Sequence, residues 1–318
     1  MKVLVTGVGG FIGFHFANYL LKKKISVIGV DNLNNYYSTK LKNIRLSLLK
    51  KNKNFTFYKF DITKKSNFKQ IFKHQNNIRI IYHLAAQAGV RFSIVNPKKY
   101  FDSNIIGFFN ILECCKEYKI KKLFYASSSS VYGDLKKFPL TEKIQLKPKN
   151  FYALSKKTNE EMADIYSNLY RFNAVGLRFF TVFGEFGRPD MFLFKLLNSY
   201  YKDKPFFLNN FGNHIRDFTY INDVVEMVMN IKIDKNTYNQ VFNICSSRPI
   251  HLKKMIRIVS NYTNLPKIIK VSFQNADILK THGNNKKILK NTKFKNFTNI
   301  NLALKNTIDW YKKYYLKF

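Results

Sequence analysis

Four consecutive serines and a tyrosine–lysine pair are the residues of this chain best suited to catalysis. The serines are residues 127–130, they follow the apolar run 123–126, and the pair is Tyr152 and Lys156. An apolar run that ends in hydroxyl groups is typical of a buried parallel strand, which presents polar groups at the carboxyl edge of its sheet. Ligands bind at that edge, so the serines predict a binding site.

Tyr152 and Lys156 lie in a segment, residues 150–171, whose apolar residues recur at roughly helical spacing. Residues four apart share one face of a helix, so a cation is expected beside the phenol. Free tyrosine has a pKa of about 10, and an opposite charge nearby lowers it by roughly one to three units. We therefore expect Tyr152 to act as a general base. In a lysine-rich chain the same spacing also arises on an ordinary helix face, so other motifs must support this role.

A glycine-rich turn near the amino terminus, between a strand-like run at residues 2–6 and a helical pattern, predicts a dinucleotide site. Its candidate cofactor-binding residues are Gly7, Gly10, Phe11, Ile12 and Gly13. Glycines at this spacing let the backbone approach a pyrophosphate at a helix amino terminus. The next strand-like run ends in Asp31, where a carboxylate would hydrogen-bond the adenosine ribose and repel a 2′-phosphate. This favours NAD over NADP.

Strand and helix patterns alternate through the first half of the chain. Strand-like runs at residues 25–30, 55–60, 78–84, 123–126 and 173–180 are separated by helical patterns. This alternation predicts an α/β fold with a Rossmann-like, doubly wound parallel sheet. After residue 180 it loosens into shorter elements, and residues 301–315 are expected to form a closing amphipathic helix.

The composition argues against several classes of protein. Hydrophobic residues make up 46% of the 318 residues, which rules out wholesale disorder. The three cysteines have no metal-type spacing, so we expect no metal site and a reducing, cytoplasmic location. The chain begins with a strand-like run and has no long apolar segment, so neither a signal peptide nor membrane contact is expected. The net charge of +36 comes from scattered lysines, which indicates compositional bias more than nucleic-acid binding.

Taken together, these motifs resemble the extended short-chain dehydrogenase/reductase family, in its NAD-dependent epimerase/dehydratase group. The resemblance rests on the glycine-rich turn, on the serines followed by Val131, Tyr132 and Gly133, and on Tyr152 with Lys156. Within the group, the chain is most similar to UDP-glucuronate 4-epimerases over essentially its whole length. The stretches that carry this similarity are residues 31–37, 85–93, 127–133 and 187–191.

The resemblance implies a bound NAD and an architecture of two parts. Residues 1–180 would form the NAD-binding Rossmann domain, with residues around 213–245 returning to it. Residues 181–318 would mainly form a smaller α/β domain that binds the UDP-sugar substrate. Besides the glycine-rich turn and Asp31, the family pattern assigns to the cofactor Asn32, Asp61, Ile62, Ala85, Ala86, Asn104, Tyr152, Lys156 and Phe180.

The family pattern assigns a second group of residues to the UDP-sugar, namely Arg91, Ser129, Ser130, Thr181, Arg188, Arg216 and Asp277. Arginine forks suit phosphate and carboxylate groups, and this chain otherwise prefers lysine, although Arg188 and Arg216 would also suit surface ion pairs. Asn275 and Ala276 stand where the family usually has a Pro-Gly pair before Asp277, which weakens that last assignment.

The serine cluster distinguishes between the reactions of the family. Dehydratases carry an Asp-Glu pair before the Val-Tyr-Gly element and UDP-glucuronate decarboxylases carry a glutamate, whereas this chain has Ser129 and Ser130. The resemblance therefore implies 4-epimerisation of UDP-glucuronate to UDP-galacturonate through a transient 4-keto sugar. Tyr152, assisted by Lys156, would remove the proton from the sugar 4-hydroxyl, and Ser128 would hydrogen-bond the same oxygen.

Two other functions stay open. One is 4-epimerisation of a neutral sugar, such as UDP-glucose or UDP-N-acetylglucosamine. The other is a catalytically silent nucleotide-binding or nucleic-acid-binding protein of the same fold, against which the intact Ser128, Tyr152 and Lys156 set speaks. The segment 97–118 is apolar nearly all round, which predicts cover by a second subunit in a homodimer, with burial inside one chain as the alternative.

Overall fold

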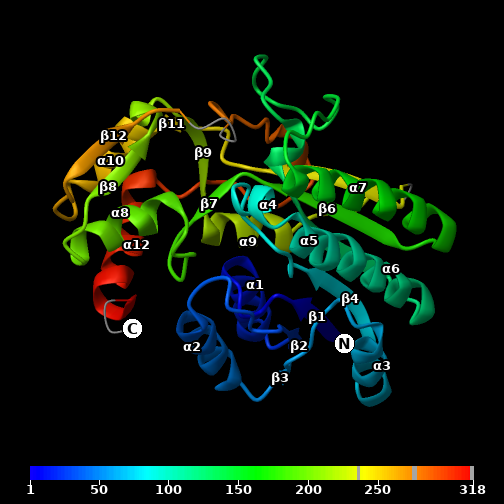
Figure 1. The fold of residues 1–318 in the computed structure, drawn as a ribbon. Helices are drawn as coiled ribbons and strands as arrows, with labels where there is room; N and C mark the ends of the chain where they lie inside the picture. Colours follow the sequence, from blue (N-terminus) through cyan, green and yellow to red (C-terminus); the bar gives the residue numbers. More distant parts are fainter. Residues whose placement is uncertain (235–236, 274–277, 316–318) are drawn as a thin grey trace.

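The computed structural model describes residues 1–234, 237–273 and 278–315. A seven-stranded parallel sheet forms its centre, in the order β10-β6-β5-β4-β1-β2-β3 (Figure 1). Its strands are β1 (Lys2–Thr6), β2 (Ser26–Val30), β3 (Phe55–Tyr58), β4 (Ile78–His83), β5 (Lys122–Ser128), β6 (Asn173–Phe179) and β10 (Asn239–Ile244). The strand order reverses between β1 and β4, which is where an open parallel sheet binds its ligands. The predicted Rossmann-like, doubly wound sheet is confirmed.

Helices cover both faces of this sheet because successive side chains of each strand point to opposite sides. In β1, Val3 and Val5 pack into one hydrophobic core and Leu4 packs into the other. The first core is covered by α1 (Phe11–Lys22), α2 (Thr39–Lys50) and α9 (Ile221–Met229). The second is covered by α3 (Lys65–His74), α6 (Gly107–Glu117) and α7 (Phe151–Tyr170) (Figure 1). Burial on both faces explains why these strands are nearly continuous apolar runs in the sequence.

The predicted helix at residues 97–118 consists of two α-helical segments with a π-helix between them. They are α5 (Pro97–Tyr100), the π-helix η1 (Phe101–Ile106) and α6, and the short helix α4 (Phe92–Val95) precedes them. The wide turns of η1 carry Asn104, whose carbonyl accepts a hydrogen bond from Asn159 Nδ2 of α7 at 2.7 Å. The irregular pitch therefore accompanies a contact with a second helix, which hydrophobic periodicity does not reveal.

Two smaller sheets lie beyond the main one, a three-stranded sheet in the order β11-β9-β7 and a two-stranded sheet of β12 and β8. Their strands are β7 (Thr181–Phe183), β8 (Phe206–Asn209), β9 (Ile215–Tyr220), β11 (Pro249–His251) and β12 (Ile268–Val271). The accompanying helices are α8 (Phe192–Tyr201), α10 (Leu252–Val259), α11 (Lys286–Lys290) and α12 (Ile300–Tyr314). The short 3-10 helices are η2 (Ser129–Tyr132) and η3 (Asn210–Gly212).

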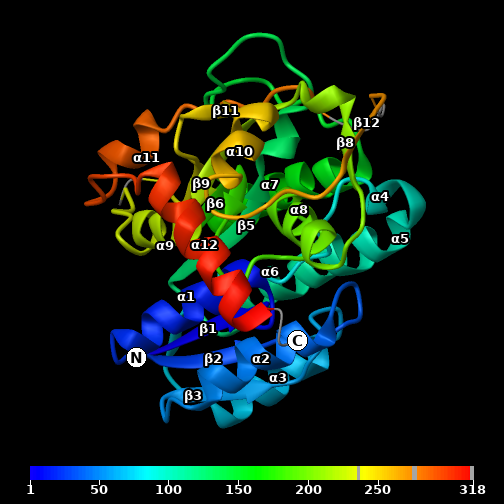
Figure 2. The ribbon, with the colours of Figure 1, turned by 90° about the vertical axis from the view of Figure 1, so that its left-hand side faces the viewer.

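The last helix, α12, joins the region of the smaller sheets to the nucleotide-binding half. Figure 2 shows it crossing from the smaller sheets toward α1. Its Trp310 packs against Phe186 and Phe194, with ring centroids 4.5 and 6.0 Å apart. The division of the chain into domains at residue 180, with the return of residues 213–245, stays a prediction. Among the described helices, none combines the length and the apolar character needed to cross a bilayer.

Candidate active site

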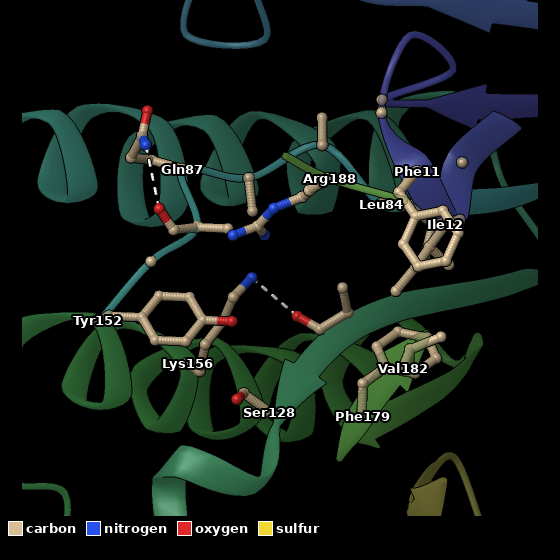
Figure 3. Close-up of a pocket in the computed structure, with 18 of the residues that line it drawn as sticks. Phe11, Ile12, Leu84, Gln87, Ser128, Tyr152, Lys156, Phe179, Val182 and Arg188 are labelled. Atoms are coloured by element: carbon tan, nitrogen blue, oxygen red, sulfur yellow. Dashed lines mark hydrogen bonds between the residues drawn. The ribbon is translucent and has the colours of Figure 1, made fainter. Parts of the chain in front are cut away.

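A cavity of about 420 Å³ opens at the carboxyl edge of the main sheet, beside β1, β4 and β5 (Figure 3). Most of the predicted site residues line it. These are Gly7, Gly10, Phe11, Ile12, Gly13, Asp31, Asn32, Ile62, Ala85, Ala86, Ser128, Ser129, Ser130, Tyr152, Lys156, Phe180, Thr181, Arg188 and Arg216. The fold thus brings residues from both halves of the chain to one pocket.

The glycine-rich turn approaches its neighbours closely because it lacks side chains. A Cβ atom on Gly13 would lie 2.1 Å from the carbonyl oxygen of Gly7, which itself has a φ of +78°. Helix α1 begins at Phe11, and among the described residues no side chain caps its amino terminus at Gly10. The first N–H groups of α1 therefore have no side-chain cap and lie at the pocket. This arrangement fits the phosphates of a dinucleotide.

Asp31 follows β2 directly and lies where the ribose of a dinucleotide is expected. Its Oδ2 accepts the N–H of Gly9 at 3.0 Å, and its Oδ1 accepts the N–H of Leu33 at 2.8 Å. Burial raises the pKa of Asp31, while these N–H groups and the charge of Lys42 favour the ionised form. Lys42 also lines the pocket, with its Nζ donating to Asn34 Oδ1 at 2.8 Å. Sequence analysis missed Lys42 because nothing distinguishes it from the other lysines of its helix.

Ser128, Tyr152 and Lys156 come together at the carboxyl end of β5 (Figure 3). Tyr152 and Lys156 lie near the start of α7, whose amino terminus is capped by the side chain of Asn150. Lys156 is 2% exposed, and its Nζ donates to the carbonyl oxygen of Ala126 in β5 at 2.8 Å. This bond fixes α7 against the strand that carries the serines.

Burial governs the two ionisable groups of this trio. Burial raises the pKa of Tyr152, whereas a hydrogen bond to Ser128 and the charge of Arg188 lower it. Burial also lowers the pKa of Lys156 to about 7, although the negative charge of Glu160 acts to raise it. The expected lowering of the Tyr152 pKa by Lys156 is therefore not found. Lys156 binds a backbone carbonyl, and removal from water outweighs the effect of nearby charges.

A buried ion pair lies behind this trio and was missed by sequence analysis. Glu160 of α7 receives bonds from Arg178 Nε and Nη2 of β6 at 2.9 and 2.7 Å, and from Ser127 Oγ at 2.5 Å. Arg178 Nη1 also donates to the hydroxyl of Tyr132 at 2.8 Å. The pairing of residues in different elements leaves no local pattern in the sequence.

Arg188 enters the pocket across from Tyr152 and Lys156 (Figure 3). Its Nε and Nη2 donate to the two oxygens of Asp190 at 2.9 and 2.5 Å, so Nη1 takes no part in this ion pair. Burial acts against the charge of Arg188, but Asp190 outweighs burial and holds the pKa of Arg188 above its usual value. Tyr36, a further lining residue that sequence analysis missed, donates to Asp190 at 3.4 Å.

Asp61 and Asn104, both predicted to bind the cofactor, lie behind the lining of the pocket. Asp61 Oδ2 accepts a bond from the side chain of Asn32 at 2.9 Å. The Asn104 side chain exchanges two bonds with the backbone of Gln87, at 2.8 and 3.0 Å, and donates to Ser155 at 3.0 Å. Asn32 and Gln87 themselves line the pocket, so Asp61 and Asn104 hold its wall in place.

The residues predicted to bind the nucleotide of the substrate are less clustered. Arg216 lines the pocket, and its Nη1 donates to the carbonyl oxygens of Ile215 and Leu279, each at 3.0 Å. Arg91 is exposed, and within the described residues it is not part of the lining. Asp277 lies outside the described residues.

Comparison with known proteins places the chain among enzymes. It matches the model of the NAD dependent epimerase/dehydratase family over residues 3–245. The chain belongs to this family. The UDP-glucuronate 4-epimerase of Thermodesulfobacterium geofontis is 38% identical to it, over 98% of this chain and 96% of that protein. Protein CapI of Staphylococcus aureus is 40% identical over 100% of both chains.

Solved structures of family members share the whole architecture. The crystal structure of UDP-glucuronic acid 4-epimerase from Bacillus cereus, in complex with UDP-glucuronic acid and NAD, matches with a TM-score of 0.90 and 28% identity, over 98% of this chain and 99% of that one. UDP-glucose 4-epimerase from Thermotoga maritima, with UDP-glucose, matches with a TM-score of 0.86 and 25% identity at the same coverage. Enzymes named for acidic and for neutral sugars thus share the fold, so the substrate must be argued from the pocket.

The lowered pKa of Lys156 predicts a pH-dependent cost of burying this side chain. Above about pH 7 the folded protein releases the proton that the unfolded chain keeps up to its pKa of roughly 10, so the wild type gains stability with rising pH. The free energy of unfolding of Lys156→Met, compared with that of the wild type, should therefore be most favourable at pH 6. Between pH 6 and pH 9 this difference in the free energy of unfolding should shrink by about 2 kcal/mol in urea titrations. Lys305→Met, at an exposed lysine, is the control, and a constant difference for Lys156→Met would contradict the assignment.

Proposed function

We propose that the chain is an NAD-dependent 4-epimerase that interconverts UDP-glucuronate and UDP-galacturonate. One observation carries this proposal: Ser128, Tyr152 and Lys156 share a pocket in which Ser129 and Ser130 stand where an eliminating enzyme would need acids. Relatives and solved structures that carry the name UDP-glucuronate 4-epimerase support it. A serine cluster without an added acid or base leaves a 4-keto sugar with one productive fate, the return of its hydride.

Residues at the strand ends would hold the cofactor. The amino terminus of α1 would bind the phosphates of NAD, Asp31 would bind its adenosine ribose, and Tyr152 with Lys156 would border its nicotinamide end. When bound, NAD supplies reversible hydride exchange with carbon 4 of the sugar. The carboxylate of Asp31 would repel the 2′-phosphate of NADP, which is why we propose NAD.

Tyr152 would act as the catalytic base and then as the acid. It would take the proton from the sugar 4-hydroxyl while Ser128 hydrogen-bonds the same oxygen. Burial disfavours the phenolate, so the Ser128 bond and positive charges near the ring must stabilise it. Tyr152 would later return the proton to that oxygen when the hydride goes back to the opposite face of carbon 4, so the reaction consumes no external oxidant. The net change is inversion at carbon 4.

The carboxylate of the sugar acid would be held on the far side of the pocket. Arg188 offers an Nη1 that its pair with Asp190 does not use, and Ser129, Ser130 and Thr181 offer hydroxyl groups. Such charge-assisted bonds are stronger than neutral ones, and they would favour a uronate over a neutral hexose. For the nucleotide of the substrate, the candidates are Arg91, Arg216 and Asp277.

The alternative functions are weaker on the same grounds. The Thermotoga maritima structure keeps 4-epimerisation of a neutral UDP-hexose as the second candidate. A neutral sugar has no carboxylate for the Arg188 Nη1 that Asp190 leaves unused, so a partly buried arginine in the pocket favours the acid. A protein that only binds nucleotides or nucleic acids, without catalysis, would not require Ser128, Tyr152 and Lys156 to lie together in one pocket.

We also propose a homodimer in the cytoplasm. Large apolar side chains are exposed by 39 to 67% on η1, α6 and α7, which pack against one another: Phe101, Phe109, Leu154, Ile165 and Leu169. Apolar side chains that are exposed together on adjacent helices indicate a surface covered by association. The three cysteines are buried free thiols, which supports a reducing compartment.

The reaction itself is the first test. Purified protein incubated with UDP-glucuronate should form UDP-galacturonate, resolved by chromatography, without consuming added NAD. Tyr152→Phe removes the proton acceptor but keeps the ring, so kcat should fall by about 10²- to 10⁴-fold with KM little changed. Tyr170→Phe, at the end of the same helix, should retain wild-type turnover. An active Tyr152→Phe would mean that the base is misassigned, and no product from UDP-glucuronate would refute the proposed reaction.

Substitution of Arg188 tests whether the pocket prefers an acidic sugar to a neutral one. A charge-assisted hydrogen bond contributes roughly 1.5 to 3 kcal/mol, so kcat/KM should favour UDP-glucuronate over UDP-glucose by at least about tenfold. Arg188→Ala should shrink this ratio by weakening the acid sugar far more than the neutral one. Equal losses for both sugars would instead assign Arg188 to the nucleotide or to the fold.

A substitution on the exposed apolar surface of α7 tests the proposed dimer. Ile165→Glu places a charge on this surface and should shift the protein from dimer to monomer in analytical ultracentrifugation. Leu302→Glu, at a similarly exposed apolar residue of α12, is the matched control and should leave the dimer intact. A wild-type monomer, or a dimer that tolerates Ile165→Glu, would rule out this interface.

A further inference from the structure

Arg45 of α2 is a fully buried cation whose hydrogen bonds within the described residues all go to neutral oxygen atoms. Its side chain is 0% exposed. Nη1 donates to the carbonyl of Gly9 and to the hydroxyl of Tyr37, each at 2.7 Å. Nη2 donates to the carbonyls of Phe186 and Gly187, at 2.6 and 3.2 Å. Burial lowers the pKa of Arg45, and the four acceptors offset part of the cost of burying its charge.

The acceptors of Arg45 belong to two segments that lie far apart in the sequence. Gly9 belongs to the glycine-rich turn, and Tyr37 lines the pocket beside the expected cofactor. Phe186 and Gly187 come immediately before Arg188, whose side chain lines the pocket across from Tyr152 and Lys156 (Figure 3). One guanidinium therefore joins the dinucleotide turn to the segment proposed to recognise the sugar acid.

A second side chain from the nucleotide-binding half holds the same segment. His15 Nε2 of α1 lies 2.9 Å from the carbonyl oxygen of Glu185, which can only accept, so this nitrogen carries the proton. Burial lowers the pKa of His15 to about 4, so the ring is neutral. Three consecutive carbonyls, those of Glu185, Phe186 and Gly187, thus receive bonds from His15 and Arg45 directly before Arg188.

The backbone of this segment needs such support. Phe186 has a φ of +55°, a conformation that residues with a side chain adopt only when their surroundings enforce it. An apolar side chain in place of Arg45 would fill space at lower desolvation cost, but it would not direct these carbonyls.

We propose that Arg45 is a positioning residue that couples the glycine-rich turn to the 184–188 segment and thereby orients Arg188 toward the carboxylate of the substrate. The inference rests on the proposed uronate specificity and deepens it. Arg45 touches neither reacting atom. It acts through Arg188, so its loss must change the discrimination between acidic and neutral sugars and not only the stability of the fold.

The test compares UDP-glucuronate with UDP-glucose by kcat/KM and by calorimetric affinity, using the full-length protein with NAD. Arg45→Lys keeps the charge, but a single ammonium group lacks the forked donors that bind all four acceptors. It should lower the preference for UDP-glucuronate by roughly threefold to tenfold, the effect of one or two lost hydrogen bonds. In an Arg188→Ala background the same substitution should leave the ratio unchanged. Phe68→Leu, at a buried core residue of α3 that does not line the pocket, is the control and should lower the melting temperature while preserving the ratio.

His15→Phe provides a second variant if Arg45→Lys does not fold, because it keeps the ring packing and removes only the bond to Glu185. Like Arg45→Lys, this variant should lower the preference for UDP-glucuronate over UDP-glucose. An unchanged ratio in the foldable variants, or an effect of Arg45→Lys that adds to that of Arg188→Ala, would overturn the role of Arg45. A wild type without preference for UDP-glucuronate would instead refute the proposed substrate, so the two failures are distinguishable.

Discussion

Removal of ionisable side chains from water is the constraint on which the rest of the pocket depends. Lys156, Arg45 and Arg178 are between 0 and 4% exposed, and a buried charge persists only with well-placed polar partners. Lys156 has a carbonyl of β5, Arg178 has Glu160, and Arg45 has four oxygen atoms. Each set of bonds joins elements that are far apart in the sequence. The hydrogen bonds that stabilise these buried charges therefore also fix the geometry of the pocket.

The two sides of the pocket are held by different kinds of interaction. The side formed by β1, β4 and β5 rests on the regular ladder of a parallel sheet. The side that carries Arg188 rests on a few bonds from His15 and Arg45 and on the packing of Phe186 against Trp310. A rigid sheet with individually held loops is suited to keeping one reaction while changing the sugar. This agrees with the shared architecture of the neighbours named for UDP-glucuronic acid and for UDP-glucose.

Local patterns allowed much of the fold to be predicted. Strand β1 occupies the expected residues 2–6, and α12 begins within one residue of the expected position. The glycine-rich turn and the Tyr152–Lys156 pair depend on short spacings that the sequence displays directly. Arg45 was not predicted, because a lone arginine in a helix of lysines and leucines carries no sign of the carbonyls that it will meet. The π-helix η1 and the raised pKa of Tyr152 likewise depend on tertiary burial.

The position of β10 at the edge of the main sheet has a consequence for how the protein is made. β10 pairs with β6, with Asn239 opposite Ala174, although the whole of β7, β8 and β9 is synthesised between them. Until the ribosome has released Ile244, β6 pairs with β5 on one side only, and its other edge is open to pairing with other chains. Pairings between distant segments form slowly because the intervening loop must close first. The growing chain therefore passes through a stage in which the nucleotide turn is complete but the sheet is not, and this stage is the one most exposed to aggregation.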